Sequence, residues 1–516
     1  MQTAEQIKTL ENKIAELEIE NKNLHETVAY LTKKLFGRSS EKLKNLNIEG
    51  QLSLFDEAET EADPETPEPP LAKVEEAHRK KYKGQRKDKL SKLPHDKIVF
   101  KLNPEECCCP QCNSRLYPVG EEFVRTEAEY IPATIRVIDY YRETLECRKC
   151  KNTEHPYMEK TPVPDPVISH SYASPASVAH VMYQKYVNAV PLYRQENDWK
   201  NLGLDLKRQT MSNWIMEASQ QWLKPIINLL HKKLLEEKYL HADETRIQVL
   251  KEPGRKNTTD SYMWVYGTYK ESETPVRLFE YRTTRNGDNA RAFLKGFKGY
   301  LVSDAYQGYE KVEGITRCYC WSHLRRYFVD ALPPGIDNPD ATLPAKAIEY
   351  CGNLFKIESD IENLTPEERK EQRTKRSKQI LDKFWLWVDK NKNECPPKSK
   401  LAKAFIYATN QKEGLMNFLL DGNISISNNL AENSIRPFTV GRRNWLFSGS
   451  PDGATASAMV YSIVETAKAN ALNPYKYLLY ILKYMPGLRF DNKPELLETF
   501  LPWNPQVQEF CNQPDK

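Results

Sequence analysis

The chain has 516 residues, enough for several domains, and its 40% apolar content is sufficient for folded cores. Its net charge is only +4, so overall charge does not by itself indicate a nucleic-acid partner. The sequence contains no apolar run long enough to span a bilayer, and it begins with a charged, helix-like segment rather than a signal peptide. We therefore expect a cytoplasmic protein without a membrane partner.

Residues 1–50 carry apolar side chains at alternating steps of three and four, a pattern typical of a coiled coil. The seam consists of Ile7, Leu10, Ile14, Leu17, Asn21, Leu24, Val28, Leu31 and Leu35. A long helix lying on its own protein would show the same seam, but the charged residues that flank it favour a partner helix. We predict a homodimer through residues 7–35.

Residues 51–103 change sharply in charge. Seven acids and no base lie between Asp56 and Glu68, with several prolines nearby, which predicts an extended linker. Eight Lys or Arg residues follow between Arg79 and Lys92. This basic segment is either simply solvated or binds phosphate groups.

Two Cys-x-x-Cys pairs lie within residues 104–158, namely Cys109 with Cys112 and Cys147 with Cys150. Each pair directs two thiolates to one point, so together they predict a tetrahedral, structural Zn²⁺ site in a zinc ribbon. The residues from Glu122 to Glu146 alternate in a way that predicts strands between the pairs. The roles of Cys107 and Cys108 stay open.

Residues 159–235 show a helical apolar pattern that ends in a basic, amide-rich segment before Trp214. This arrangement suits a helix-turn-helix whose last helix enters the major groove of DNA. Arg208, Gln209 and Asn213 would then contact base edges. The alternative is a helical spacer with these side chains in water.

Strand-like runs cover Tyr239 to Leu250, Ser261 to Thr268 and Val276 to Tyr281, and a helix-like stretch covers Asp288 to Phe297. Further strands end at Asp304 and near Trp321, and a helix is predicted from His323 to Ala331. This order is the one expected of a ribonuclease-H-like α/β sheet, with Asp243 on its first strand and Asp304 just after its fourth. We assign residues 236–332 to the first part of that domain. Cys318 and Cys320 are interpreted as small buried core residues.

The stretch between Asp304 and Glu432 is too long for a single loop. Amphipathic patterns within it predict an all-helical insertion at 333–425. The domain would resume at 426–490, where an Asn-rich start before Leu430 suits a helix entry that carries Glu432. Residues 491–516 form a C-terminal element.

Asp243, Asp304 and Glu432 would form a triad of carboxylates. Such groups repel one another unless a divalent cation neutralises them, and oxygen ligands select hard cations. Two Mg²⁺ or Mn²⁺ ions in such a site would support phosphoryl transfer on nucleic acid.

Several blocks of the sequence resemble the transposase family of insertion sequence 66. They are the runs His241–Thr245, Gly299–Tyr306, Cys320–Arg326, Asn428–Asn433, Gly441–Ser450 and Glu465–Asn470, and the tail Pro494–Trp503 is also similar. Ala305 and Ser322 depart from residues that are common in these blocks, but neither change removes a metal ligand.

The resemblance implies a multidomain α+β DDE transposase that binds element ends and target DNA in the bacterial cytoplasm, at the nucleoid when bound. It also implies two small accessory proteins encoded beside it. Phosphate contacts are predicted for basic residues near the acids, with ordinary surface charge as the alternative: His323, Arg325, Arg326, Arg436, Arg442 and Arg443.

Two other functions fit parts of the pattern. A structure-selective nuclease of the same fold would cut DNA without joining it. A regulator without catalytic activity would use only the ribbon, the helices and the coiled coil, but it would not need the triad of acids.

Overall fold

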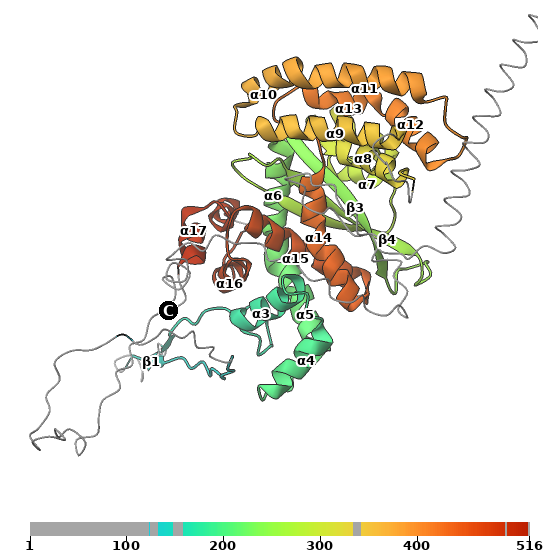
Figure 1. Ribbon diagram of the computed structural model, residues 1–516. Coiled ribbons are helices and arrows are strands. Elements are labelled where there is room, and N and C mark those ends of the chain that lie inside the picture. Colours follow the sequence, from blue (N-terminus) through green and yellow to red (C-terminus); the bar gives the residue numbers. More distant parts are fainter. Residues whose placement is uncertain (1–122, 124–132, 148–157, 334–341, 491–492, 514–516) are drawn as a thin grey trace, which may run out of the picture. The chain divides into compact units, whose positions relative to one another are not determined.

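The computed structural model describes residue 123 and residues 133–147, 158–333, 342–490 and 493–513 (Figure 1). Within these ranges, the chain from Tyr140 to Asn512 belongs to one compact unit. The predicted coiled coil at 7–35, the linker and basic segment at 51–103, and Cys107, Cys108, Cys109, Cys112 and Cys150 lie outside the described residues.

Two short strands flank the second predicted cysteine pair. β1 (Thr144–Glu146) pairs in antiparallel fashion with β2 (Met158–Lys160), and Cys147 directly follows β1. β1 falls in the stretch for which alternation predicts strands, but its partner lies beyond the second cysteine pair rather than between the pairs.

Helices precede the main sheet, as the apolar pattern predicts. They are α3 (Pro175–Tyr186), α4 (Leu192–Asn201), α5 (Arg208–Ala218), the π-helical turn η3 (Ser219–Leu223) and α6 (Lys224–Glu236). The Ser174 side chain caps α3 by accepting the N–H of Ser177, and Pro175 occupies its first turn. Val178, Met182, Trp214 and other apolar residues of these helices are buried, which fixes the faces that they present inward.

The main sheet has the strand order β5-β4-β3-β6-β7 within the described residues, and the short β8 also pairs with β3. The strands are β3 (Tyr239–Val249), β4 (Asp260–Thr268), β5 (Arg277–Arg282), β6 (Gly299–Ser303), β7 (Ile315–Tyr319) and β8 (Phe447–Ser448). β4 runs antiparallel to β3 and β5, whereas β6 runs parallel to β3 and β7. The predicted strand sequence and the neighbouring places of the first and fourth strands are therefore confirmed.

Two element boundaries differ from the prediction. Helix α7 (Gly287–Phe293) ends before Phe297, because the chain turns at Gly296, whose φ of 93° suits glycine. β7 ends at Tyr319, and Trp321 already begins α8 (Trp321–Asp330). The 3-10 turn η4 (Gln307–Lys311) connects β6 to β7.

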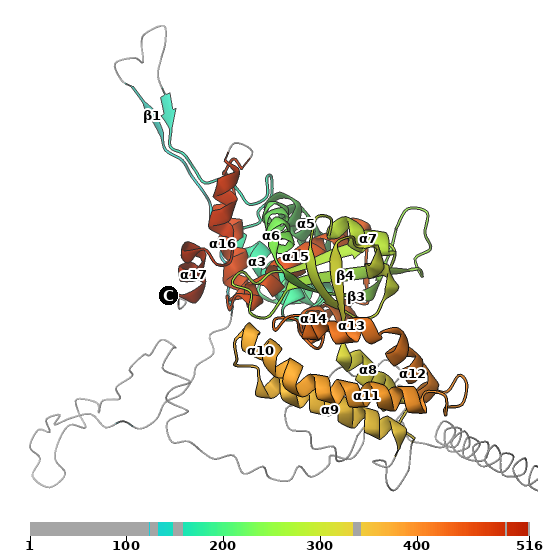
Figure 2. The same cartoon turned by 90° about the horizontal axis from the view of Figure 1, so that it is seen from above.

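Between α8 and α14 (Asn429–Trp445), every regular element of the described residues is helical. These elements are α9 (Leu343–Asp360), α10 (Pro366–Gln372), the π-helical η6 (Arg373–Ser377), α11 (Lys378–Asn391), α12 (Lys400–Asn410), α13 (Lys412–Met416) and the 3-10 turn η7 (Asn417–Leu419). They share one core with the sheet, in which Val302 and Cys318 lie in the same cluster as Trp321, Phe384 and Phe405. Figures 1 and 2 show α9–α12 and α3–α5 on opposite sides of β3 and β4.

The last elements are α15 (Pro451–Ala469), α16 (Pro474–Tyr484), the 3-10 turn η8 (Pro494–Phe500) and α17 (Pro505–Asn512). Helix α15 lies along the edge strand β5 and completes its hydrogen bonds. Ser462 Oγ accepts the N–H of Phe279 at 2.7 Å, and Thr466 Oγ1 accepts the N–H of Arg277 at 3.0 Å. Two backbone donors of this strand are thus satisfied by one helix face, which covers part of an edge that could otherwise pair with another strand.

In the part of the chain that the structure describes, none of the helices combines the length and the apolar character required to cross a membrane.

The contact between α15 and β5 gives a stability prediction. Thr466→Val should lower the free energy of unfolding by about 1–3 kcal/mol, because the buried N–H of Arg277 loses its acceptor. Thr455→Val is the matched control on the same helix, where the hydroxyl bonds only to Pro451 O within the helix, and a change within about 0.5 kcal/mol is expected. Urea unfolding measures both; equal effects would contradict the role given to Thr466.

Candidate functional site

The sheet register brings Asp243 and Asp304 together. Residue His241 of β3 lies opposite Val302 of β6, so two residues further along these parallel strands Asp243 comes beside Asp304. β6 ends at Ser303, which leaves Asp304 at the carboxyl end of the strand. This edge of an open sheet is where such folds commonly place ligands.

Glu432 reaches the same place from α14, in the first turn of that helix. Asn428, just before the helix, is fully buried and binds β3 through its side chain. Its Nδ2 donates to Ala242 O at 2.9 Å, and its Oδ1 lies 3.1 Å from His241 Nδ1. We call these two contacts of the Asn428 side chain the Asn428 clasp. Because Ala242 directly precedes Asp243, the clasp fixes the start of α14, and hence Glu432, beside Asp243.

Backbone donors orient the two aspartates. Asp243 Oδ1 accepts the N–H of Glu244 at 2.9 Å, and Asp304 Oδ1 accepts the N–H of Tyr306 at 3.0 Å. Arg317 Nη2 donates to Asp304 O at 2.6 Å and holds the backbone at the end of β6. The carboxylates are therefore held by their surroundings.

The site concentrates negative charge. Burial raises the pKa of Asp243 well above its ordinary value, and the charges of Glu244, Glu432 and Asp304 raise it further, while His323 lowers it. Such mutual repulsion favours either a proton or a cation at the site. Three oxygen ligands from separate elements fit a hard divalent cation such as Mg²⁺ or Mn²⁺.

Sequence reasoning missed a fourth acid, Glu244, whose side chain is only 1% exposed. Its carboxylate accepts hydrogen bonds from Arg285 Nε at 2.7 Å and from the Tyr309 hydroxyl at 2.6 Å. Burial and the charge of Asp304 raise the pKa of Glu244, whereas Arg285 and Tyr309 oppose that rise. Arg285 Nη2 also lies 3.6 Å from Asp304 Oδ2 and so offsets part of the charge of both acids.

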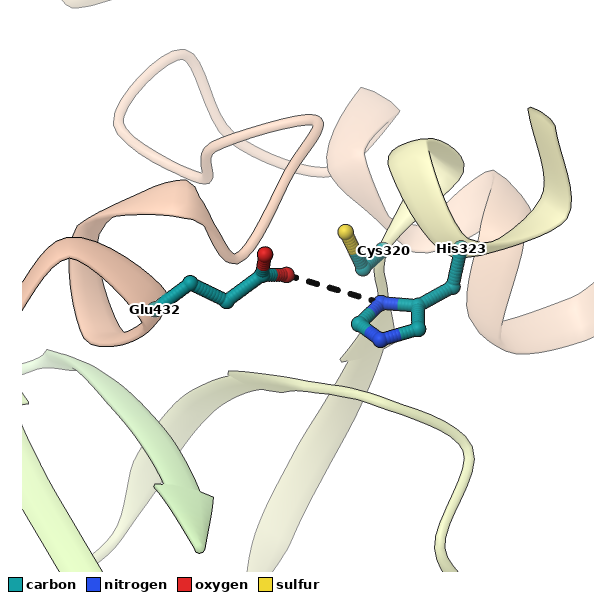
Figure 3. A group of neighbouring side chains, drawn as sticks. All are labelled: Cys320, His323 and Glu432. Atoms are coloured by element: carbon teal, nitrogen blue, oxygen red, sulfur yellow. Dashed lines mark ion pairs between the residues drawn. The ribbon is translucent and has the colours of Figure 1, made fainter. Parts of the chain in front are cut away.

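A second group of potential ligands meets at Glu432. The Cys320 sulfur, a His323 ring nitrogen and a Glu432 carboxylate oxygen all lie within 4.8 Å of one another (Figure 3). His323 Nδ1 is 3.7 Å from Glu432 Oε1. Burial lowers the pKa of His323, but the contact with Cys320 and the charges of Glu432 and Asp304 outweigh it and raise that pKa to about 9.

The interpretation of Cys318 and Cys320 as equivalent core residues is therefore incomplete. Both are buried, but Cys320 follows β7 and caps α8, where its sulfur accepts the N–H of Asn428 at 3.1 Å. The spacing Cys-x-x-His was visible in the sequence, and at the start of a helix it brings the first and fourth side chains together.

The predicted DNA-contact residues lie on three helices. On α5, Arg208, Gln209 and Asn213 are exposed, and Gln209 Nε2 donates to Asn213 Oδ1 at 3.0 Å. On α8, Arg325 and Arg326 are partly buried; on α14, Arg436 and Arg443 are exposed, and Arg442 Nη1 donates to Thr245 Oγ1 on β3 at 3.2 Å. His323 thus lies beside Glu432, Arg442 contacts β3 two residues beyond Asp243, and α5 belongs to the helices before the sheet.

Of the four predicted zinc ligands, Cys147 is the one within the described residues, and it is partly buried. Cys109, Cys112 and Cys150 lie outside them.

Comparisons with known proteins cover most of the chain. The family model described as "Transposase IS66 family" matches residues 170–456, and the "zinc-finger binding domain of transposase IS66" matches residues 106–151, a span that contains both cysteine pairs and suggests structural zinc. The "Transposase C of IS166 homeodomain" matches residues 23–98, and the "IS66 C-terminal element" matches residues 462–503.

Similar chains occur in Sinorhizobium fredii. Uncharacterized protein y4hP is 28% identical over 80% of this chain and 75% of its own length. Uncharacterized protein y4jD is 29% identical over 80% of each chain. Uncharacterized protein y4qI is 30% identical over 63% of this chain and 62% of its own length. No solved structure matches this chain.

The match to the "Transposase IS66 family" model spans more than half of the sequence and includes Asp243, Asp304 and Glu432. Three further models of IS66-type transposases match on either side of it. The chain belongs to the IS66 family of transposases.

Proposed function

We propose that this chain is a DDE transposase with a ribonuclease-H-like catalytic domain, in which Asp243, Asp304 and Glu432 bind two Mg²⁺ ions. It cuts the ends of an insertion sequence and joins the freed 3′-hydroxyls to target DNA. The observation that carries the proposal is the convergence of the three acids from β3, the end of β6 and the first turn of α14.

The fit of the residues to divalent metal rests on their chemistry. All three ligands are carboxylates; burial, and then the charges of the neighbouring acids, raise the pKa of Asp243, and a cation would relieve the repulsion. Bound Mg²⁺ would polarise the scissile phosphate and make a water or a 3′-hydroxyl a better nucleophile.

The protein residues position these groups. The N–H of Glu244 binds Oδ1 of Asp243, and the N–H of Tyr306 binds Oδ1 of Asp304. This leaves Oδ2 of Asp243 for a ligand, whereas Oδ2 of Asp304 lies 3.6 Å from Arg285 Nη2 and would bind a cation in competition with that contact. Glu432 is carried on a helix rather than a loop, and the Asn428 clasp limits its movement toward β3. A site on rigid elements holds reacting atoms in register for in-line attack.

The other modules are assigned to DNA and to a second protomer. The ribbon with Cys109, Cys112, Cys147 and Cys150 and the helices α3–α5 with Arg208, Gln209 and Asn213 bind element ends. His323, Arg325, Arg326, Arg436, Arg442 and Arg443 contact phosphates. Residues 7–35 pair two protomers, and two small accessory proteins assist. The helical stretch α9–α13 is the insertion within the catalytic domain, and the protein works at the nucleoid in the cytoplasm.

The deciding experiment incubates the purified protein with candidate element ends, target DNA and Mg²⁺, and sequences the products. Joined DNA with element 3′ ends in the target supports a transposase. Cleavage without joining would instead indicate a nuclease, and binding without cleavage would indicate a regulator.

Replacing the acids should separate chemistry from binding. Asp243→Asn, Asp304→Asn and Glu432→Gln should each lower Mg²⁺-dependent cleavage by more than about 100-fold while end binding changes little, because each substitution removes a ligand charge but little volume. Asp389→Asn on α11, which disrupts an exposed ion pair with Lys392, should cleave normally. Near-normal cleavage by any of the three variants would remove that residue from the site.

Protons and metal should compete at Asp243. Its raised pKa means that the metal-free folded protein holds a proton there more tightly than the unfolded chain, so the stability that this group contributes is lost as pH rises through the raised pKa. Mg²⁺ should therefore increase the melting temperature more at about pH 8 than at about pH 5.5. Asp243→Asn should reduce this pH dependence. A Mg²⁺ effect equal at both values would contradict the competition.

Zinc should depend on Cys147. Cys147→Ser should lower the zinc content of protein purified without chelator and weaken binding to element ends, because a thiolate ligand is lost from the ribbon. Cys395→Ser is the control: this partly buried thiol lies between α11 and α12, and its replacement should leave the zinc content unchanged. Metal analysis and a DNA-binding assay test both variants; unchanged zinc in Cys147→Ser would exclude this residue as a ligand.

A further inference from the structure

We propose that Cys320, His323 and Glu432 form a binding site for a borderline or soft divalent cation such as Zn²⁺, adjacent to the carboxylate triad and sharing Glu432 with it. Occupation of this site by Zn²⁺ holds Glu432 away from Asp243 and Asp304 and inhibits Mg²⁺-dependent cleavage. The inhibitory consequence rests on the proposed function, whereas the binding site does not.

The three ligand atoms already lie close to the spacing that zinc needs. Bonds of about 2.0–2.3 Å in a tetrahedron place neighbouring ligand atoms about 3.3–3.6 Å apart. His323 Nδ1 and Glu432 Oε1 are 3.7 Å apart, and no two of the three ligand atoms are more than 4.8 Å apart. Small side-chain rotations close the remaining gap, and the fourth position is left for water.

The backbone explains why these side chains meet. Cys320 is the N-cap of α8 and His323 is the third residue of the helix, so both side chains project from its first turn. Glu432 arrives from the first turn of α14, and Figure 3 shows its carboxylate directed toward the His323 ring. Two helix starts therefore face each other across the site.

The surroundings of the Cys320 sulfur would stabilise a metal-bound thiolate. Its position at the start of α8 favours negative charge, and the N–H of Asn428 donates to it at 3.1 Å. Amide donors of this kind commonly support metal-bound thiolates. On binding, the thiol proton of Cys320 and the Nδ1 proton of the charged His323 ring both leave to solvent, and the cation takes their place.

The donor set distinguishes this site from the triad. A thiolate, an imidazole and one carboxylate prefer Zn²⁺ or Co²⁺, whereas Asp243, Asp304 and Glu432 offer oxygen alone and prefer Mg²⁺. Glu432 is the shared ligand, and its charge acts both on His323 and on Asp243. A cation held by Cys320 and His323 would bind Glu432 Oε1 and would repel a second cation at the neighbouring triad, so the two metals oppose each other.

Cobalt provides the direct test. Full-length protein whose ribbon has been loaded with Zn²⁺ is titrated with Co²⁺, and the sulfur-to-cobalt absorption band is recorded. The wild type should develop this band. Cys320→Ser should lose the added band, and His323→Gln should weaken Co²⁺ binding by at least about tenfold because it removes the imidazole ligand. Cys318→Ser is the matched control: this thiol is buried two residues away on β7, contacts Thr316 O, and should leave the band unchanged.

Cleavage provides the second readout. Zn²⁺ added to a Mg²⁺ reaction should inhibit the wild type and Cys318→Ser alike, and the Zn²⁺ concentration for half-inhibition should rise at least about tenfold in Cys320→Ser.

The outcomes separate the two proposals. A wild-type cobalt band that persists in Cys320→Ser, or no added band in the wild type, overturns the site even if cleavage is normal. A protein that binds Co²⁺ through Cys320 and His323 but never cleaves DNA keeps the site and rejects the proposed function. Binding without a change in zinc sensitivity of Cys320→Ser overturns the inhibitory role.

Discussion

The buried side chain of Asn428 is the interaction on which the site depends. The side-chain Nδ2 donates to Ala242 O, and the side-chain Oδ1 forms a hydrogen bond with His241 Nδ1. The backbone N–H of Asn428 donates to the Cys320 sulfur. Burial lowers the pKa of His241 to about 4, so this ring is neutral, and since the Asn428 oxygen only accepts, the hydrogen must be on His241 Nδ1. A single residue thus connects β3, the start of α8 and the start of α14. Together with the hydrogen bond from the Trp321 N–H to Ile426 O, these contacts fix Glu432 near Asp243.

This clasp works against electrostatic repulsion. Asp243, Glu244, Asp304 and Glu432 repel one another, and burial, followed by the charges of the other three acids, raises the pKa of Asp243. Arg285 and Tyr309 donate hydrogen bonds to Glu244, so that its charge is compensated within the protein. Stability must come from elsewhere, in particular from β3 at the sheet centre and from α15 along β5. Functional sites commonly have such local conflict within a stable frame.

The sequence predicts the strands, and the places of Asp243 and Asp304 relative to them, because each strand is a short apolar run with its acid in it or directly after it. Glu432 is predicted by the helix entry around Asn428. The roles of Glu244, Arg285 and Cys320 could not be predicted in the same way, since they depend on which distant side chains meet. Glu244 contacts Arg285 and Tyr309, which lie 41 and 65 residues away in the sequence. Gly296 indicated that α7 ends before Phe297, but the prediction followed the apolar pattern, which continues to Phe297.

The long separation of Asp304 and Glu432 raises a physical question, since closing a long loop costs entropy and a loosely tethered acid would not hold a metal. The helical stretch α9–α13 packs onto the sheet instead of extending from it, so the chain between the two acids is not a free loop. Trp321, next to Cys320, is fully buried; its backbone N–H donates to Ile426 O at 3.0 Å and its indole N–H donates to Leu415 O at 2.8 Å. The chain is therefore held both where it leaves the sheet, at α8, and where it returns, before α14. The place of Glu432 is therefore fixed by contacts of Trp321 and Asn428, at the two ends of the helical stretch, rather than by the length of the chain between them.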